Sequence, residues 1–292
     1  MTAPQLIDPP LQLSLVVLTY NEEQNLDDCL HSVSGLCREV FVVDSGSTDG
    51  TLEIAHRYAC VKHNPFETHA RQWEWALRNL PLSNDWILAL DADQRLTPEL
   101  SRELHSLFSE GLIPANVNGF YVNRRQIFKG QWIRHGGYYP KYLLKLFRAS
   151  RVRLDPGELV DHHFYVPGVT RKLRHDLVEE NRKENDISFW IQKHNRYARL
   201  LAQEELERRT KPGCLIHPSP LGSPDQRTLW KKGLWRRCPA YVRPLLYFVY
   251  RYFFQLGLLD GKQGFVFHFL QAFWFRLLVD INVEELKSGR TR

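Results

Sequence analysis

Three stretches of the sequence decide the fold: LQLSLVVLTY at residues 11–20, EVFVVDS at 39–45 and DWILALDAD at 85–93. Each is a nearly unbroken run of leucine and β-branched residues that ends in polar side chains, which is typical of strands buried on both faces. Helical apolar spacing fills the segments between them, at residues 22–34, 51–58 and 68–80. Strands and helices in alternation predict an α/β fold with a mostly parallel sheet flanked by helices.

Polar side chains gather where these three strands end. In open α/β sheets, ligands bind at the edge where the carboxyl ends of the strands meet. The residues that fall there are Thr19, Tyr20 and Asn21 after the first strand, Asp44 and Ser45 after the second, and Asp91 and Asp93 after the third. The sequence therefore predicts a binding site at this edge of the sheet.

Asp91-Ala92-Asp93 is the first motif that can carry chemistry. The two-residue period of a strand points both carboxylates the same way, close enough to share a hard cation and a diphosphate. A divalent ion between carboxylate and phosphate oxygens stabilises the charge that develops on a diphosphate leaving group. Oxygen ligands favour Mg²⁺ or Mn²⁺ over zinc. The alternative is two solvated aspartates at a strand end.

VVDSGSTDGT, residues 42–51, is the second motif. Asp44 closes a strand, and the Gly/Ser-rich turn after it opens a helix, so its carboxylate is placed to accept hydrogen bonds from a base or ribose while the next amides face phosphate. The alternative is a structural βα turn, capped by Ser47 or Thr48 with Asp49.

Together these segments resemble glycosyltransferase family 2: LSLVVLTYNEEQNLDDCLHSV at 13–33, EVFVVDSGSTDGT at 39–51 and WILALDAD at 86–93. The rest of the chain resembles, more loosely, the lipopolysaccharide-core and exopolysaccharide branch of that family. The resemblance implies the Rossmann-like GT-A fold and an inverting, hexosyltransferase-type enzyme. It also implies a divalent cation, Mg²⁺ or Mn²⁺, and a nucleotide-sugar donor, usually a UDP-sugar, with GDP and dTDP sugars left open.

The resemblance also assigns roles to individual side chains. Thr19, Tyr20 and Glu22 match the turn that contacts the nucleotide, and Asp44 matches the carboxylate that reads the nucleobase. Asp91 matches the first DxD position, near ribose or diphosphate, and Asp93 the second, the principal metal ligand. The chain departs from the branch at Gln94, where Glu is usual, and at residues 72–74, Gln-Trp-Glu, where Gln-x-Asn is common.

An inverting transfer needs a base that takes the proton of the acceptor hydroxyl. The branch often places it in a Val-His-Glu segment, and the local counterpart here is GELVDHHF, residues 157–164. Asp161 is the first candidate, because it follows Val160 and precedes two histidines that can orient it. Glu158 is the second candidate. The alternative for His162 and His163 is a surface or packing role.

The sequence divides into a catalytic domain, residues 11–210, and a C-terminal aromatic and basic region, residues 225–292. Residues 187–210 have a helical pattern in which Trp190, His194 and Tyr197 share a face that favours core packing. The loop around residues 130–140 is expected to be a mobile, basic substrate loop or simply a solvated one.

Aromatic and aliphatic residues fill two segments of the C-terminal region, 241–259 and 265–281, and both segments contain arginine. They predict helices that lie in the membrane interface or pack on the catalytic domain, and a spanning segment around residues 244–259 stays open. The formal charge of +6 suits nucleotide phosphates and anionic lipid.

The location and the competing classes follow from composition. The N-terminus has no basic and apolar leader pattern, and five scattered cysteines suit reduced thiols, so we expect a cytoplasmic protein peripherally associated with the inner face of the membrane. Nucleic acid is not expected as a partner, since carboxylates at successive strand ends repel a polyanion. The alternatives are a polyprenyl-phosphate sugar transferase and, more remotely, a non-catalytic membrane-binding module. A nucleotidyltransferase would usually have a glycine-rich phosphate loop near the N-terminus. The segment LVVLTYNEEQNL, residues 15–26, contains no glycine, which disfavours that class.

Overall fold

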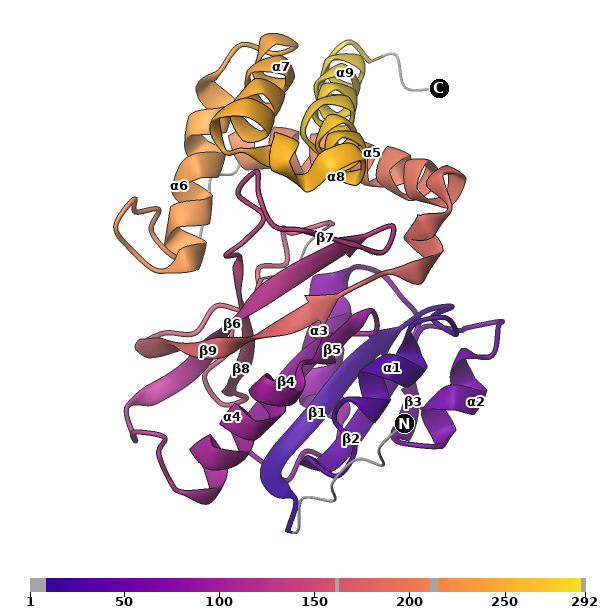
Figure 1. The fold of residues 1–292 in the computed structure, drawn as a ribbon, viewed down its shortest axis with the longest axis vertical. Helices are drawn as coiled ribbons and strands as arrows, with labels where there is room; N and C mark the ends of the chain where they lie inside the picture. The colour runs from indigo at the N-terminus through magenta and orange to yellow at the C-terminus, as the bar shows by residue number, and fades with distance from the viewer. Residues whose placement is uncertain (1–8, 161–162, 211–214, 290–292) are drawn as a thin grey trace. The chain divides into compact units, whose positions relative to one another are not determined.

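The computed structural model describes residues 9–160, 163–210 and 215–289 (Figure 1). The chain forms two compact units that do not follow the sequence order. Unit 1 comprises residues up to 125, 142–154 and 164–182, and unit 2 comprises residues 126–141, 155–163 and 183–292.

The sheet begins with the parallel strands that the apolar runs predict. Its first four strands lie in the order β3-β2-β1-β4 and pair in parallel: β1 (Leu11–Thr19), β2 (Cys37–Asp44), β3 (Cys60–His63) and β4 (Trp86–Asp91). The predicted α/β fold is confirmed, and the strands end where the polar motifs begin.

The sheet is mixed, because its second half is antiparallel. It continues from β4 in the order β8-β6-β9-β5, while β7 pairs with β6 beside this path. The bounds are β5 (Gln94–Leu96), β6 (Val117–Phe128), β7 (Gln131–Ile133), β8 (Tyr142–Arg148) and β9 (Val169–Glu179). Lys129 and Gly130, both with positive φ, form the tight turn between β6 and β7.

Helices cover both faces of the sheet in unit 1: α1 (Leu26–His31), α2 (Thr51–His56), α3 (His69–Asn79) and α4 (Pro98–Ser109). Alternate residues of the strands face opposite sides. Leu15 and Val17 belong to one core cluster, with Leu30 of α1 and Leu100 of α4. Their neighbour Val16 belongs to the other, with Trp73 and Ala76 of α3 and the strand residues Phe41, Val43, Ile87 and Ala89.

The described part of unit 2 is mostly helical from residue 183 onward, and it also includes residues 126–141 and the segment 155–163. Its helices are α5 (Ile187–Thr210), α6 (Pro224–Arg237), α7 (Val242–Val249), α8 (Gly261–His268) and α9 (Phe275–Lys287), with π turns at Tyr250–Phe254 (η2) and Phe269–Trp274 (η4) and a 3₁₀ turn at Gly257–Asp260 (η3). A further 3₁₀ turn, η1 (Arg182–Asn185), precedes α5.

Helix α5 packs on α9 through one apolar cluster, formed by Ala198, Ala202, Phe275, Val279 and Val283. Helix α5 spans the residues predicted for it, 187–210. The predicted core role of its aromatic face is confirmed, since Trp190 and His194 are buried and their ring centroids stack 3.5 Å apart. The predicted division at residues 11–210 and 225–292 groups α5 with the sheet, whereas in the structure α5 belongs to the same compact unit as the C-terminal helices.

A buried ion triad also holds the C-terminal helices together. Arg243 of α7 donates to Asp280 of α9 and to Glu205 of α5, and all three side chains are buried. Because a buried charge needs a close partner, these contacts fix the three helices to one another.

The segment expected to be a mobile loop is bonded to the C-terminal helices within unit 2. Asp260 accepts hydrogen bonds from the backbone N–H of His135 at 2.9 Å and pairs with its Nδ1 at 2.7 Å, and Arg251 donates to the carbonyl of Gly136. His268 lies fully buried beside Gly136 and Gly257, and neither of its ring nitrogens has a hydrogen-bond partner among the described residues.

One helical stretch among the described residues, Gly257–Lys287, is long and apolar enough to cross a membrane, with a mean hydropathy of 1.3 over its best window. Buried helices of soluble proteins have the same length and composition, so this is weak evidence on its own.

Candidate functional site

The predicted site residues of the first three strands lie side by side in unit 1. In the sheet register Thr19 of β1 is paired with Asp44 of β2, and Leu18 of β1 is paired with Asp91 of β4. The strands are parallel and end together, so the three polar residues share one edge of the sheet.

The loops after β1 and β2 are bonded to each other. The N–H of Asn21, which has a positive φ, donates to the Ser47 hydroxyl, and the Asn21 side chain accepts from the N–H of Thr48 at 2.8 Å. The N–H of Glu22 donates to Thr51 at 2.7 Å. These bonds hold the two motifs of the sequence in one rigid arrangement.

Asp44 is 1% exposed, and its carboxylate accepts hydrogen bonds from its own turn. One oxygen accepts from the N–H groups of Gly46 and Ser47, at 2.8 and 2.9 Å. The other accepts from the hydroxyls of Ser47 and Thr19. This is the arrangement of the structural βα turn, and the role of Asp44 in reading a nucleobase stays a prediction.

The expected cap of α2 differs in detail. The helix has Gly50 as its N-cap, and the Asp49 carboxylate accepts from the N–H of Thr51 at 3.0 Å. Ser47 does not cap this helix, because its hydroxyl is bonded to Asp44.

Tyr20 and Glu22 follow Thr19 on the open side of the edge. The Tyr20 side chain is exposed, whereas that of Glu22 is half-buried and accepts from the Asn25 amide at 2.8 Å. Both are therefore available at the surface of the predicted site, and their contacts with a nucleotide stay predictions.

Asp91, the last residue of β4, pairs with a lysine that the sequence did not point out. The Lys145 ammonium on β8 is almost fully buried and donates to Asp91 Oδ2 at 2.7 Å. Because β8 lies beside β4 in the antiparallel half of the sheet, this contact depends on pairing that the motif alone does not reveal.

Asp93 is not in a strand, contrary to the prediction that one strand carries both carboxylates. β4 ends at Asp91, and Ala92 and Asp93 form a turn that leads into β5. Both carboxylates are nevertheless partly exposed, while Ala92 between them is buried. The turn therefore presents the pair to solvent, although the two-residue period of a strand is not the reason.

Gln94 stabilises this turn. Its side chain is buried, accepts from the N–H of Asp91 at 3.1 Å and donates to Glu179 of β9 at 2.7 Å. Glu179 in turn accepts from Arg124 at 2.8 Å. Gln94 thus stabilises the motif here. Arg124 and Arg125 of β6 pair with the β9 acids Glu179 and Asp176.

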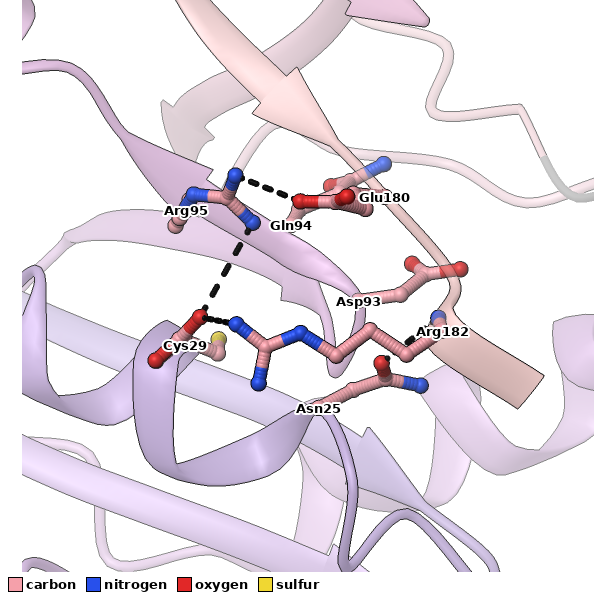
Figure 2. Close-up of a pocket in the computed structure, with 8 residues that line it drawn as sticks. Asn25, Cys29, Asp93, Gln94, Arg95, Glu180 and Arg182 are labelled. Atoms are coloured by element: carbon pink, nitrogen blue, oxygen red, sulfur yellow. Dashed lines mark hydrogen bonds and ion pairs between the residues drawn. The ribbon is translucent and has the colours of Figure 1, made fainter. Parts of the chain in front are cut away.

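A shallow polar pocket lies on one side of Asp93 (Figure 2). It is lined by Asn25, Asp28, Cys29, Asp93, Gln94, Arg95, Glu180 and Arg182. Arg95 pairs with Glu180 at 2.7 Å, and Arg182 pairs with Asp28. The backbone N–H of Glu180 donates to the carbonyl of Asp93 at 2.9 Å, so this side of the pocket supports the turn that carries Asp93.

Cys29 lies beneath the carboxylates, with its thiol 3.7 Å from the Asp91 carbonyl. Burial raises its pKa far above the usual range, and the negative charges of Asp93, Asp91 and Glu22 raise it further. The thiol is therefore neutral, and its environment shows that three acidic groups gather at this edge.

Gln72 of α3 secures the other side of the site. It is buried, donates to the Ser45 hydroxyl at 3.1 Å and accepts from the Asn64 amide at 2.6 Å. Glu74, two positions on, forms an exposed pair with Arg78. The chain departs from the branch pattern at Glu74, whereas Gln72 is hydrogen-bonded to Ser45 and so stabilises the turn after β2.

The donor atoms at the edge fit a divalent cation. Among the described residues, no group of three or more His, Cys, Asp or Glu side chains is arranged to hold a metal ion. Asp91 and Asp93 offer carboxylate oxygens without sulfur or imidazole, and Mg²⁺ and Mn²⁺ use one or two such carboxylates together with substrate phosphates.

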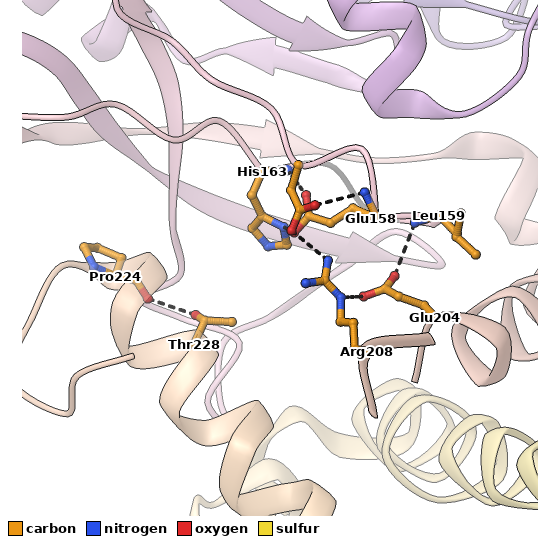
Figure 3. A network of polar contacts seen from close by, with 9 residues as sticks. Glu158, Leu159, His163, Glu204, Arg208, Pro224 and Thr228 are labelled. Atoms are coloured by element: carbon orange, nitrogen blue, oxygen red, sulfur yellow. Dashed lines mark hydrogen bonds and ion pairs between the residues drawn. The ribbon is translucent and has the colours of Figure 1, made fainter. Parts of the chain in front are cut away.

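In unit 2, the candidate base Glu158 is 3% exposed (Figure 3). It accepts from the backbone N–H of His163 at 2.8 Å and pairs with His163 Nδ1 at 2.7 Å. Asp161 and His162 lie outside the described residues. The role of either carboxylate as the base stays a prediction.

The segment that carries these candidates is bonded to α5. Glu204 accepts from the N–H of Leu159 at 3.2 Å, and Arg208 donates to Asp155 at 2.9 Å and to Glu204 at 3.0 Å. Burial acts to lower the pKa of Arg208, but the Asp155 hydrogen bond and the Glu204 charge raise it overall. The network positions Glu158 and His163 (Figure 3).

Comparison with known proteins agrees with this geometry. The family model "Glycosyl transferase family 2" matches residues 14–177. The lipopolysaccharide core biosynthesis glycosyltransferase LpsC of Rhizobium meliloti is 30% identical over 249 residues, 78% of this chain and 84% of LpsC. An uncharacterised glycosyltransferase of Rickettsia bellii is 36% identical over 99 residues, 34% of this chain and 33% of that protein.

Among solved structures, glucosyl-3-phosphoglycerate synthase from Mycobacterium tuberculosis, in complex with Mn²⁺, UDP and glucosyl-3-phosphoglycerate, is 23% identical with a TM-score of 0.33. That match covers 39% of this chain and 44% of the synthase. The family model covers more than half of the chain, and the similarity to LpsC extends over most of both proteins. The chain therefore belongs to glycosyltransferase family 2.

Proposed function

We propose that this protein is an inverting, metal-dependent glycosyltransferase that transfers a sugar from a UDP-sugar to a glycan or lipid-linked acceptor in lipopolysaccharide core synthesis. The observation that carries the proposal is the presence of Asp91 and Asp93 at the sheet edge that also holds Thr19 and Asp44. The similarity to LpsC, named for lipopolysaccharide core biosynthesis, supports the acceptor class.

Asp93 and Asp91 would hold the divalent cation, which supplies positive charge to a departing diphosphate. Lys145 fixes one oxygen of Asp91 and so orients that carboxylate. Gln94 fixes the turn between them through the Asp91 N–H. The bonded loops of Asn21 and Ser47 bring the Tyr20 side chain to the same edge, where its ring is placed to contact a nucleotide.

The donor class is tested by calorimetric titration with UDP, GDP and CMP, each with and without Mn²⁺. We expect binding of UDP that needs Mn²⁺ and is lost in Asp93→Asn. Asp27→Asn is the matched control, because Asp27 is a half-exposed aspartate paired with Arg57 and is not part of the Asp91-Ala92-Asp93 motif. Absence of binding to every nucleotide, with and without metal, would sink the proposal and favour a non-catalytic membrane-binding module.

We further propose that Asp161 is the general base, with Glu158 as the second candidate. The burial of Glu158 and its contacts with His163 favour a positioning role for Glu158. Asp161→Asn should lower turnover at least about a hundredfold while UDP binding is unchanged. Full turnover in Asp161→Asn, with turnover lost in a folded Glu158→Gln variant, would reverse the assignment.

Acceptor class and stereochemistry need separate measurements. Transfer to lipopolysaccharide core acceptors, without transfer to polyprenyl phosphate, is the expected result, and the reverse would support a polyprenyl-phosphate sugar transferase. The proton spectrum of the first product should show inversion at the anomeric carbon.

We also propose that the enzyme works in the cytoplasm, peripherally associated with the inner face of the membrane, where a lipid-linked acceptor is available. The cationic charge and the aromatic C-terminal helices support this location.

A further inference from the structure

Large apolar side chains lie exposed on a continuous part of unit 2. We call them the aromatic surface, and they are Phe253, Phe254, Leu256, Leu259, Phe265 and Phe269. Phe254 is 76% exposed and the others are between 39% and 57% exposed. Scattered single apolar residues are normal on a soluble protein, whereas a cluster of this kind indicates a partner.

Ring contacts connect three members of the aromatic surface, Phe253, Phe265 and Phe269, through Tyr252. Tyr252 contacts Phe253 at a centroid distance of 5.1 Å and Phe265 at 5.7 Å. Phe265 stacks on Phe269 at 6.0 Å. The surface therefore joins the π turn η2 to α8 and η4.

The charge near this surface indicates which partner it takes. Residues 226–259 contain seven Lys or Arg and no Asp or Glu. Five of these cations are on α6, and none of the five is buried. Helix α6 meets α7 through Trp235, whose ring lies 5.3 Å from Tyr247. Exposed apolar side chains in the same unit as these five accessible cations suit an anionic lipid surface, whereas a second copy of the chain would bring like charges together.

Packing within unit 2 argues against a spanning helix. The apolar stretch Gly257–Lys287 includes α9, and one face of α9 packs on α5 through Phe275, Val279 and Val283. Asp280 on the same helix is buried in its pair with Arg243. A helix that uses this face and this carboxylate for the protein core is not free to enter the hydrocarbon region.

We propose that the aromatic surface inserts into the headgroup region of an anionic membrane while the cations of α6 bind lipid phosphates. This inference rests on the membrane association of the proposed function and specifies its residues and lipid class. The attachment is peripheral, through side chains of the turns η2, η3 and η4 and of the helix α8.

The test is sedimentation of the full chain with phosphatidylcholine vesicles, with and without phosphatidylglycerol. We expect binding that needs the anionic lipid and weakens with salt. Phe253→Ser/Phe254→Ser should weaken vesicle binding about tenfold or more, because two aromatic side chains that would insert into the membrane are lost. Lys231→Gln/Lys232→Gln should remove most of the dependence on anionic lipid. Leu112→Ser is the control, because Leu112 is exposed to a similar degree but belongs to unit 1.

Unchanged vesicle binding in the phenylalanine variant would overturn the inference, and so would equal binding of the wild-type chain to neutral vesicles. A third contrary result would be a wild-type dimer in analytical ultracentrifugation that becomes monomeric in the phenylalanine variant, because the aromatic surface would then be a dimer interface. UDP titration of the phenylalanine variant separates this inference from the proposed function. Retained UDP binding with lost vesicle binding supports both, and lost UDP binding in the wild-type chain counts against the proposed function alone.

Discussion

Asp91 and Asp93 look equivalent in the sequence, but they differ in their structural setting. Lys145 is 4% exposed, and its ammonium group donates to Asp91 Oδ2 at 2.7 Å. A buried ammonium group without a carboxylate nearby is strongly unfavourable. Asp91 therefore contributes to folding, in addition to any role in binding.

This difference predicts how substitutions separate stability from activity. Asp91→Ala should lower the free energy of unfolding by about 2 kcal/mol, because Lys145 stays buried without its partner. Asp93→Ala, in an exposed turn, should lower it by less than about 0.5 kcal/mol. Urea denaturation of both variants measures this, and equal losses would show that the Lys145 pair does not stabilise the fold.

His268 is expected to make stability depend on pH. Burial, and then the charge of Arg251, lowers the pKa of His268 to about 4 from 6.5. Between these values the unfolded chain binds a proton that the folded chain does not, so stability falls as pH falls from 6.5 to 4, by about 3 kcal/mol in total.

The measurement is urea denaturation at several pH values. His268→Leu should flatten the profile in this range, while His56→Leu, at an exposed position in α2, should leave it unchanged. A profile that keeps its slope in His268→Leu would assign the pH dependence to other groups.

At the scale of elements, the parallel strands could be predicted from the sequence, because short, nearly unbroken apolar runs that alternate with helical segments are typical of buried parallel strands. It placed Asp93 in a strand because periodicity carries no information on where the hydrogen bonding of β4 stops. It missed Lys145 and the acids of β9 for a different reason. Lys145 lies 54 positions from Asp91, and only the antiparallel pairing of the sheet brings them together.

Helix α4 offers a test of local structure beside the site. The Thr97 hydroxyl caps α4 by accepting from the N–H of Leu100 and donates to the Asp176 carbonyl of β9 at 2.7 Å. Thr97→Val keeps the shape but leaves both buried groups unpaired, so it should cost about 2 kcal/mol. Thr68→Val removes the cap of α3 alone and should cost about 1 kcal/mol. Equal costs, measured by urea denaturation, would contradict the second role of Thr97.

At the scale of the molecule, the two units interleave along the chain. The change in composition after residue 210 predicted a domain boundary there, which placed α5 with the sheet. In the structure α5 instead shares an apolar cluster with α9. Composition cannot reveal this, because α5 has the charged and apolar mixture of any surface helix. The candidate base segment also falls in unit 2, although it lies between strands of unit 1 in sequence.

Separate cores predict separate responses to mutation. Arg243→Ala leaves Asp280 and Glu205 buried without their common partner, so it should destabilise unit 2 by about 3 kcal/mol or more. UDP binding should survive, since the carboxylate edge belongs to unit 1. Circular dichroism melting combined with UDP titration checks both, and loss of UDP binding in step with the melting of unit 2 would contradict the separation.

The packing around His268 has an evolutionary consequence. A Cβ atom on Gly257 would lie 2.6 Å from the imidazole Nε2, and one on Gly136 would overlap the ring. The imidazole therefore occupies the space that side chains at both positions would need. Homologues that keep the histidine should keep both glycines, whereas a change to a small residue at 268 should relax the constraint at 257 first, because Gly136 also has a positive φ. Position 136 is thus expected to vary together with positions 257 and 268, although it lies far from both in the sequence.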